Sequence, residues 1–198
     1  RLYIYKLKKM MKVGLYFGSF NPVHNGHITV AKYMHSHYPI DEIWYVLSPQ
    51  NPLKKAEDLL DEASRLKLLE VAIQPYSFMK ISTIEFEMPK PSYTYLTMRE
   101  LKKRYPDTFF YIIMGNDVML SIDLWKNYQE ILDENVIYLY PRNDIELLII
   151  SKNIIQTDAP SVMISSSDIR NKIKLGESIQ DLLPDEVYEI IESEKFYQ

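Results

Sequence analysis

The chain has 198 residues, a formal net charge of −4, 46% hydrophobic residues and no cysteine. This length suits one well-buried domain, and the negative charge argues against a broad nucleic-acid surface. The missing cysteines exclude disulfides and thiol chemistry and fit a reducing cytoplasm, and no apolar run reaches the roughly 18 residues of a membrane span, so we expect no membrane partner.

Short apolar runs alternate along the chain with longer amphipathic stretches, which is typical of strands alternating with helices. Residues 1–10 precede Met11 and lack the features of a signal peptide, so we expect an N-terminal extension there and one domain over residues 11–198. Strands are expected at 13–17, 42–47, 79–86, 108–114, 136–140 and 154–157, and helices at 28–34, 61–73, 91–104, 124–132, 169–175 and 185–191. Residues 146–150 suit either element. The alternation predicts an α/β fold with a doubly wound parallel sheet, which binds ligands at the carboxyl ends of its strands.

Residues 12–27 (KVGLYFGSFNPVHNGH) join an apolar strand to a helix through a glycine turn. Such a junction points main-chain N–H groups and the positive end of the helix at one place, which favours an anion and above all a phosphate. His24 and His27 would add ring N–H donors there. The alternatives are a plain turn with two solvated histidines, or a zinc site, for which only His35 and His37 remain as further histidine ligands.

Polar residues also follow three later strands, namely Lys54 with Lys55, Gly115 with Asp117, and Arg142. Loops are usually polar, so Lys54 and Lys55 also suit a solvated pair, and Asp117 suits either a helix N-cap or an acceptor for ribose hydroxyls. The carboxyl ends of parallel strands share one edge of the sheet. This common edge favours a shared ligand.

Three hydroxyls at 165–167 stand immediately before the helix expected at 169–175, with Arg170 near its first turn. In one interpretation Ser166 or Ser167 caps the helix and Arg170 is solvated. In the other, hydroxyls, amides and guanidinium form a second phosphate cradle. Ser92 is expected as the N-cap of the helix at 91–104, and Trp125 suits either a core position on a helix or a platform for a ligand.

The run GSFNPVHNGH resembles the (T/H)xGH signature of the nucleotidyltransferase α/β-phosphodiesterase superfamily. Residues 164–170 resemble its ISSTxIR motif, with Ser167 where threonine is usual. The form with His24 in the first position is similar to bacterial nicotinate-mononucleotide adenylyltransferases, as are NPLK at 51–54, SYT at 92–94 and the GxDxxxxxxxW pattern at 115–125. The resemblance covers residues 11–197 and implies a single Rossmann-like nucleotidyltransferase domain.

The resemblance implies adenylyl transfer from ATP, with Mg²⁺, to nicotinate mononucleotide, giving nicotinate adenine dinucleotide and pyrophosphate. It implies catalytic roles for His24 and His27 and no direct metal ligand. The resemblance also implies three sets of binding residues. The ATP phosphates would be contacted by Gly18, Ser19, Lys54, Ser166, Ser167 and Arg170. Adenosine would be contacted by Gly115, Asp117 and Arg142, and the pyridine nucleotide by Tyr93, Thr94 and Trp125.

Other functions stay open at this point. A phosphopantetheine adenylyltransferase of the same superfamily would carry threonine at the position of His24 and would lack the Trp125 stretch, and a cytidylyltransferase is disfavoured for similar reasons. A non-catalytic nucleotide-binding regulator would keep the glycine turn without needing both His27 and Arg170. The sequence leaves the oligomeric state open, a homo-oligomer included.

Overall fold

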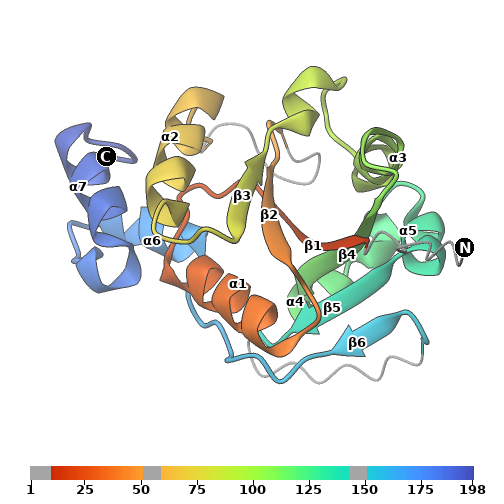
Figure 1. Ribbon diagram of the computed structural model, residues 1–198. Helices are drawn as coiled ribbons and strands as arrows, with labels where there is room; N and C mark the ends of the chain where they lie inside the picture. Colours follow the sequence, from red (N-terminus) through yellow and green to blue (C-terminus); the bar gives the residue numbers. More distant parts are fainter. Residues whose placement is uncertain (1–9, 51–58, 143–150) are drawn as a thin grey trace, which may run out of the picture.

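A six-stranded parallel sheet forms the centre of the fold, in the order β3-β2-β1-β4-β5-β6 (Figure 1). The computed structural model describes residues 10–50, 59–142 and 151–198. The strands are β1 (Met11–Gly18), β2 (Glu42–Leu47), β3 (Met79–Ser82), β4 (Thr108–Gly115), β5 (Val136–Tyr140) and β6 (Ile154–Gln156). Because β2 and β4 lie on opposite sides of β1, the strand order reverses between β1 and β4, which is where open sheets bind ligands. The predicted doubly wound parallel sheet is confirmed.

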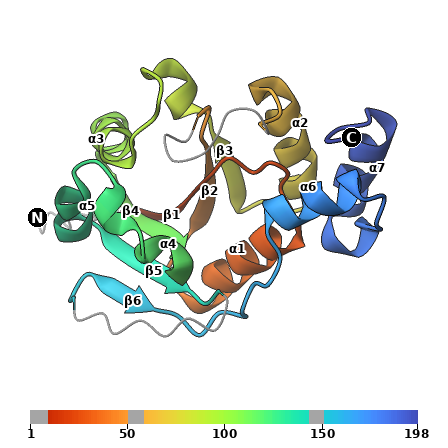
Figure 2. The same cartoon turned by 180° about the vertical axis from the view of Figure 1, so that it is seen from behind.

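Helices cover both faces of the sheet, as Figures 1 and 2 show from opposite sides. One face packs against α1 (Asn25–His37), α2 (Glu62–Ile73), α6 (Ser166–Lys174) and α7 (Asp185–Ser193), and the other packs against α3 (Thr94–Arg104), α4 (Asn116–Met119) and α5 (Tyr128–Glu134). Successive strand side chains point to opposite faces, so Tyr16 and Ile113 join the first cluster while Leu15 and Ile112 join the second. Within the described ranges, no helix has the length and apolarity required to cross a membrane.

The expected strand at 79–86 is wrong in its second half. β3 ends at Ser82, and a 3₁₀ helix, η2 (Ile84–Glu87), follows it. Ile84 and Glu85 are both buried. Consecutive residues of a strand point to opposite faces, whereas a helical turn can bury two neighbours on the same side.

The expected helix at 124–132 is also wrong at its start. A 3₁₀ helix, η3 (Ile122–Leu124), comes first, Trp125 is extended, and α5 begins only at Tyr128. Asn127 interrupts the helix with a left-handed backbone (φ 54°), a conformation that asparagine tolerates better than most residues. Trp125 therefore lies in the connection between two short helices and not on a helix.

Two predicted caps shift by one residue. α3 begins at Thr94 with Tyr93 as its N-cap, so Ser92 does not cap it. Ser165 caps α6 by accepting a hydrogen bond from the Asp168 N–H (3.1 Å), which leaves the side chains of Ser166 and Ser167 for other contacts. The remaining predicted helices and strands are present with shifted ends, and another 3₁₀ helix, η4 (Gln180–Leu182), precedes α7. The described residues leave out 1–9, 51–58 and 143–150. The predictions for Lys54, for Lys55 and for the undecided stretch at 146–150 therefore lie outside the described residues.

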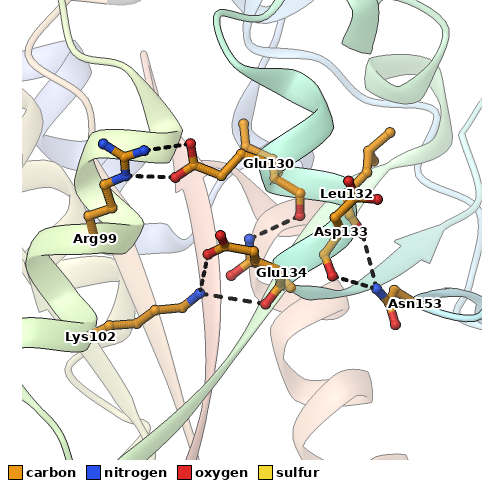
Figure 3. A network of polar contacts seen from close by, with 9 residues as sticks. Arg99, Lys102, Glu130, Leu132, Asp133, Glu134 and Asn153 are labelled. Carbon is orange, nitrogen blue, oxygen red and sulfur yellow. Dashed lines mark hydrogen bonds and ion pairs between the residues drawn. The ribbon is translucent and has the colours of Figure 1, made fainter.

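Charged side chains join α3 to α5 on the side of the molecule away from α1 (Figure 3). Arg99 binds both carboxylate oxygens of Glu130 (2.7 Å each), and Lys102 approaches Glu134 (3.5 Å). The Asn153 amide donates to the carbonyls of Leu132 and Asp133 near the end of α5 (3.2 and 2.9 Å). The cations of both pairs are solvent-exposed, so screening by water keeps the contribution of these pairs to stability small.

Candidate active site

A pocket of about 1100 Å³ opens at the carboxyl ends of β1, β4 and β5. Its volume lies at the upper end for small-molecule sites, which leaves room for two substrates side by side. The predicted site residues that the structure describes all line it: Gly18, Ser19, His24, His27, Tyr93, Thr94, Gly115, Asp117, Trp125, Arg142, Ser166, Ser167 and Arg170. Five sequence segments thus converge on the predicted edge of the sheet. Of the predicted set, Lys54 lies outside the described residues.

The two histidines of the HxGH motif stack face to face at the start of α1, with ring centroids 3.7 Å apart. The His24 main-chain N–H donates to Nδ1 of His27 (3.2 Å). An Nδ1 that accepts this bond carries no proton, so a neutral His27 ring holds its proton on Nε2 and presents Nε2–H as a donor. This hydrogen bond, made between residues three apart at the start of α1, therefore fixes the tautomer of a neutral His27 ring.

Aromatic rings hold the His27 imidazole from two further sides. Tyr16 and Phe20 contact it edge-on, with centroids 5.7 and 5.0 Å away. The Tyr45 hydroxyl donates to the His27 carbonyl (3.2 Å). These contacts restrict the ring to one orientation at the pocket wall.

Position 26 requires glycine because neighbouring side chains leave no room for a Cβ atom there. A Cβ at this position would lie 2.5 Å from Cγ1 of Val162 and 3.0 Å from Nδ1 of His24. The glycine of the motif therefore makes room for the His24 ring rather than supplying a left-handed backbone.

His24 is buried and carries an unsatisfied ring atom. It is 3% exposed, and among the described residues its Nδ1 has no hydrogen-bond partner. Burial is the main cause that lowers the pKa of His24 to about 3; the nearby Arg142 guanidinium adds to this effect and Asp168 opposes it. The ring is therefore neutral at physiological pH.

We expect His24 to make the free energy of unfolding decrease as the pH falls from about 6.5 to about 3. In this window the unfolded chain binds a proton at His24 and the folded chain does not, which costs at most about 1.4 kcal/mol per pH unit. Urea unfolding at several pH values should therefore show that the wild type loses stability faster than His24→Gln as the pH falls. The two slopes of unfolding free energy against pH should differ by about 1 kcal/mol per pH unit. Equal slopes for the two proteins would contradict the burial of a neutral ring.

The turn after β1, which we call the β1 turn (Ser19–Pro22), is fixed through its carbonyl groups. Arg170 donates to the Asn21 carbonyl (2.8 Å), and the Ser166 hydroxyl donates to the Pro22 carbonyl (2.9 Å). The two predicted phosphate motifs, far apart in the sequence, are thus in direct contact. Arg170 also reaches the Ser167 hydroxyl (3.3 Å), so part of its guanidinium faces the amino end of α6.

Asp117 and Arg142 meet at the ends of β4 and β5. Arg142 Nη1 lies 3.3 Å from Asp117 Oδ2, and the Arg142 N–H donates to the Asn116 side chain (2.8 Å). Asp117 lies inside α4, whose N-cap is Gly115, so the N-cap interpretation of Asp117 is wrong. Its Oδ1 has no hydrogen-bond partner among the described residues. An acceptor is therefore available to a ligand hydroxyl.

The amino end of α3 and the η3–α5 connection line the same pocket with mixed polarity. Tyr93 and Thr94 occupy the start of α3, and Trp125 is half-buried against the core cluster on that face. The Lys126 ammonium lies 4.8 Å from the centre of the Tyr93 ring. A helix amino end beside an indole suits a flat ring that carries a carboxylate.

Several pocket residues were missed by sequence reasoning. Tyr16 and Tyr140 form a buried hydroxyl pair (2.9 Å), and burial raises the pKa of both, so the hydroxyls stay protonated. Glu85 also lines the pocket, where it accepts from Thr97 (2.8 Å) and burial raises its pKa. No local motif indicates these residues, because Tyr16 on β1 meets Tyr140 on β5 across β4, and Glu85 on η2 meets Thr97 on α3.

Arg65 was missed as well, although the sequence contains a signal. It occupies the buried stripe of α2 with Leu68, Leu69 and Ala72, at i, i+3, i+4 and i+7. Its guanidinium is fully buried and donates to four carbonyls, those of Ser19, Ser48, Pro49 and Leu60, at 2.7–3.0 Å. A charged residue on an apolar helix stripe is the pattern that could have revealed it.

Comparisons with known proteins agree with this geometry. Residues 15–172 match the family described as Cytidylyltransferase-like. A protein of Flavobacterium johnsoniae named "Probable nicotinate-nucleotide adenylyltransferase" is 46% identical over 95% of this chain and 100% of its own length, and one of the same name from Flavobacterium psychrophilum is 43% identical over 95% and 100%. The solved nicotinic acid mononucleotide adenylyltransferase of Plasmodium falciparum complexed with NaAD superposes with a TM-score of 0.81 at 20% identity, covering 94% of this chain and 97% of that one. The chain belongs to the nicotinate-nucleotide adenylyltransferase family.

Proposed function

We propose that the chain transfers the adenylyl group of ATP to nicotinate mononucleotide, forming nicotinate adenine dinucleotide and pyrophosphate. The observation that carries this proposal is the convergence of both phosphate motifs, the α3 amino end and Trp125 on one pocket, in a chain 46% identical to a relative named for this activity. A binding module would need only part of this set.

In the proposed step, an oxygen of the mononucleotide 5′-phosphate attacks the α-phosphorus of ATP. A new P–O bond forms, the bond from the α-phosphorus to the α,β-bridging oxygen breaks, and pyrophosphate leaves with the electron pair. The attacking oxygen is already anionic, so no proton has to be abstracted. The protein has to align the reactants and stabilise the charge that develops on the phosphoryl oxygens.

We assign the α-phosphoryl oxygens to His27 and His24. The Nε2–H of His27 is a donor in a fixed ring, which suits a transition state whose charge exceeds that of the ground state. Gly18 and Ser19 would contribute from the turn. The leaving pyrophosphate would be held by Lys54, Ser166, Ser167 and Arg170, together with the amino end of α6.

For the two nucleoside ends we assign opposite sides of the pocket. Asp117, with its unpartnered Oδ1, would accept from the ATP ribose, and Gly115 and Arg142 would lie against adenosine. Thr94 and the α3 amino end would bind the pyridine carboxylate, with Tyr93 and Trp125 against the ring. Mg²⁺ would enter bound to the ATP phosphates, as part of the substrate.

The deciding experiment is pyrophosphate release with ATP and Mg²⁺, offering nicotinate mononucleotide, its amide and phosphopantetheine in parallel. We expect the acid to exceed the amide in kcat/KM by at least roughly fivefold, because a carboxylate at a helix amino end gains about 1 kcal/mol or more over a neutral amide. Turnover with phosphopantetheine instead would overturn the pyridine assignment. No turnover with any acceptor would favour the nucleotide-binding regulator.

A further inference from the structure

The Asn21 side chain links the β1 turn to two distant parts of the chain. Asn21 is 3% exposed, and its Oδ1 accepts hydrogen bonds from the Leu60 N–H (3.1 Å) and from the Tyr197 hydroxyl (2.8 Å). Its own carbonyl accepts from Arg170. Leu60 precedes α2 and Tyr197 follows α7, so one buried side chain joins three segments that are remote in sequence.

Both segments that this contact joins contain a residue with a left-handed backbone. Phe20, next to Asn21 in the β1 turn, has a φ of 43°, and Tyr197 has a φ of 66°. This region is unfavourable for aromatic residues, and it persists where the surroundings hold it. The turn leads directly into His24 and carries Ser19, so its conformation sets the position of the pocket's phosphate-facing wall.

The surroundings of Tyr197 keep its hydroxyl a donor. The side chain lies close to the cations Arg170 and Arg65 and to Asp61, and it is one of the half-buried residues packed against the core. Burial raises the pKa of the Tyr197 hydroxyl, against the opposing effect of the two guanidinium groups, so it stays protonated. The protonated phenol donates its hydrogen bond to the Asn21 side-chain oxygen.

From this geometry we propose that Tyr197 is a positioning residue of the active site, which acts on the phosphate-facing wall through Asn21. The inference rests on the proposed function, because it assigns a role in that same reaction. Tyr197 has no contact with the reactants in this assignment. The hydrogen bond from its hydroxyl to Asn21 holds the β1 turn in its conformation, and the turn positions the histidine pair and Ser19.

The test compares Tyr197→Phe with Tyr188→Phe, which removes a half-buried hydroxyl on α7 from the same core region. Loss of one hydrogen bond should lower kcat for pyrophosphate release, and weaken ATP binding in titration calorimetry, about five- to tenfold. KM for nicotinate mononucleotide should stay within twofold of wild type, and Tyr188→Phe should match wild type in all three quantities. A merely structural role would lower thermal stability and leave kcat per folded molecule unchanged.

A double-mutant cycle with Asn21→Leu tests the route of the effect. In the Asn21→Leu background, Tyr197→Phe should change kcat less than twofold, because the acceptor is already gone. The same fold-change in both backgrounds, or wild-type kcat in Tyr197→Phe alone, would overturn the inference.

The assay also separates the two proposals. If wild type shows no turnover with any acceptor, the proposed function fails, and weaker ATP binding by Tyr197→Phe alone would still support the positioning role, whereas equal ATP binding would overturn it. A wild type that neither turns over nor binds ATP would overturn both.

Discussion

Replacement of His27 by alanine should lower kcat for pyrophosphate release at least about a hundredfold while the protein remains folded. A fixed donor directed at developing charge contributes roughly 3 kcal/mol to transition-state stabilisation, and alanine removes the Nε2–H that supplies it. The matched control is His37→Ala, which removes an exposed histidine at the far end of the same helix and should leave kcat unchanged. Circular dichroism and thermal melting establish that both variants fold.

A second variant separates the catalytic role of His27 from its structural role. Asparagine can still accept the His24 main-chain N–H through Oδ1, in the place of Nδ1, but it has nothing at the position of Nε2–H. We therefore expect His27→Asn to be as slow as His27→Ala. Recovery of activity in His27→Asn would mean that the ring serves only to cap α1, and near-normal turnover in His27→Ala would remove the catalytic assignment altogether.

Replacement of Arg65 by methionine should destabilise the protein by about 4 kcal/mol. The change leaves four carbonyls, which now accept from the fully buried guanidinium, without their donor, and each such loss costs about 1 kcal/mol or more. For a chain of this size the melting temperature should fall by about 10 °C. Urea unfolding and a thermal melt measure the two quantities.

Lys67→Met is the matched control for Arg65, because Lys67 lies on the exposed side of the same helix and forms a long ion pair with Glu194 (3.6 Å). It should change stability by no more than about 0.5 kcal/mol. If Arg65→Met proved as stable as Lys67→Met, water would have to replace the guanidinium as the hydrogen-bond donor to the four carbonyls. The interpretation of Arg65 as the link between α2 and the ends of β1 and β2 would then fail.

Contiguous sequence motifs predicted many of the residues that line the pocket. The glycine turn with His24 and His27, and the hydroxyls before Arg170, are contiguous motifs, so their residues could be named before the fold was known. Their common location followed from the alternation of strands and helices, because the carboxyl ends of parallel strands share an edge. The structure places these motifs in contact through Ser166 and Arg170.

Element ends were less predictable. The apolar run at 79–86 continues past Ser82, yet the chain turns into η2, since tertiary packing buries Ile84 and Glu85 together. Asn127 breaks an amphipathic pattern that otherwise suits a helix from Leu124 onward. In both places a local preference competed with packing against the rest of the chain, and the packing prevailed.

By itself, the sequence determined the strand–helix alternation, the two phosphate motifs and the family resemblance, because each depends on residues adjacent in the chain. Only the tertiary structure decided which side chains support that machinery. Arg65, Tyr197 and Tyr140 reach the pocket region from α2, from the segment after α7 and from β5, and their partners are 46, 176 and 124 residues away. A hydrogen bond between such remote positions has no period or spacing in the sequence, since it exists only once the sheet and its helices have packed.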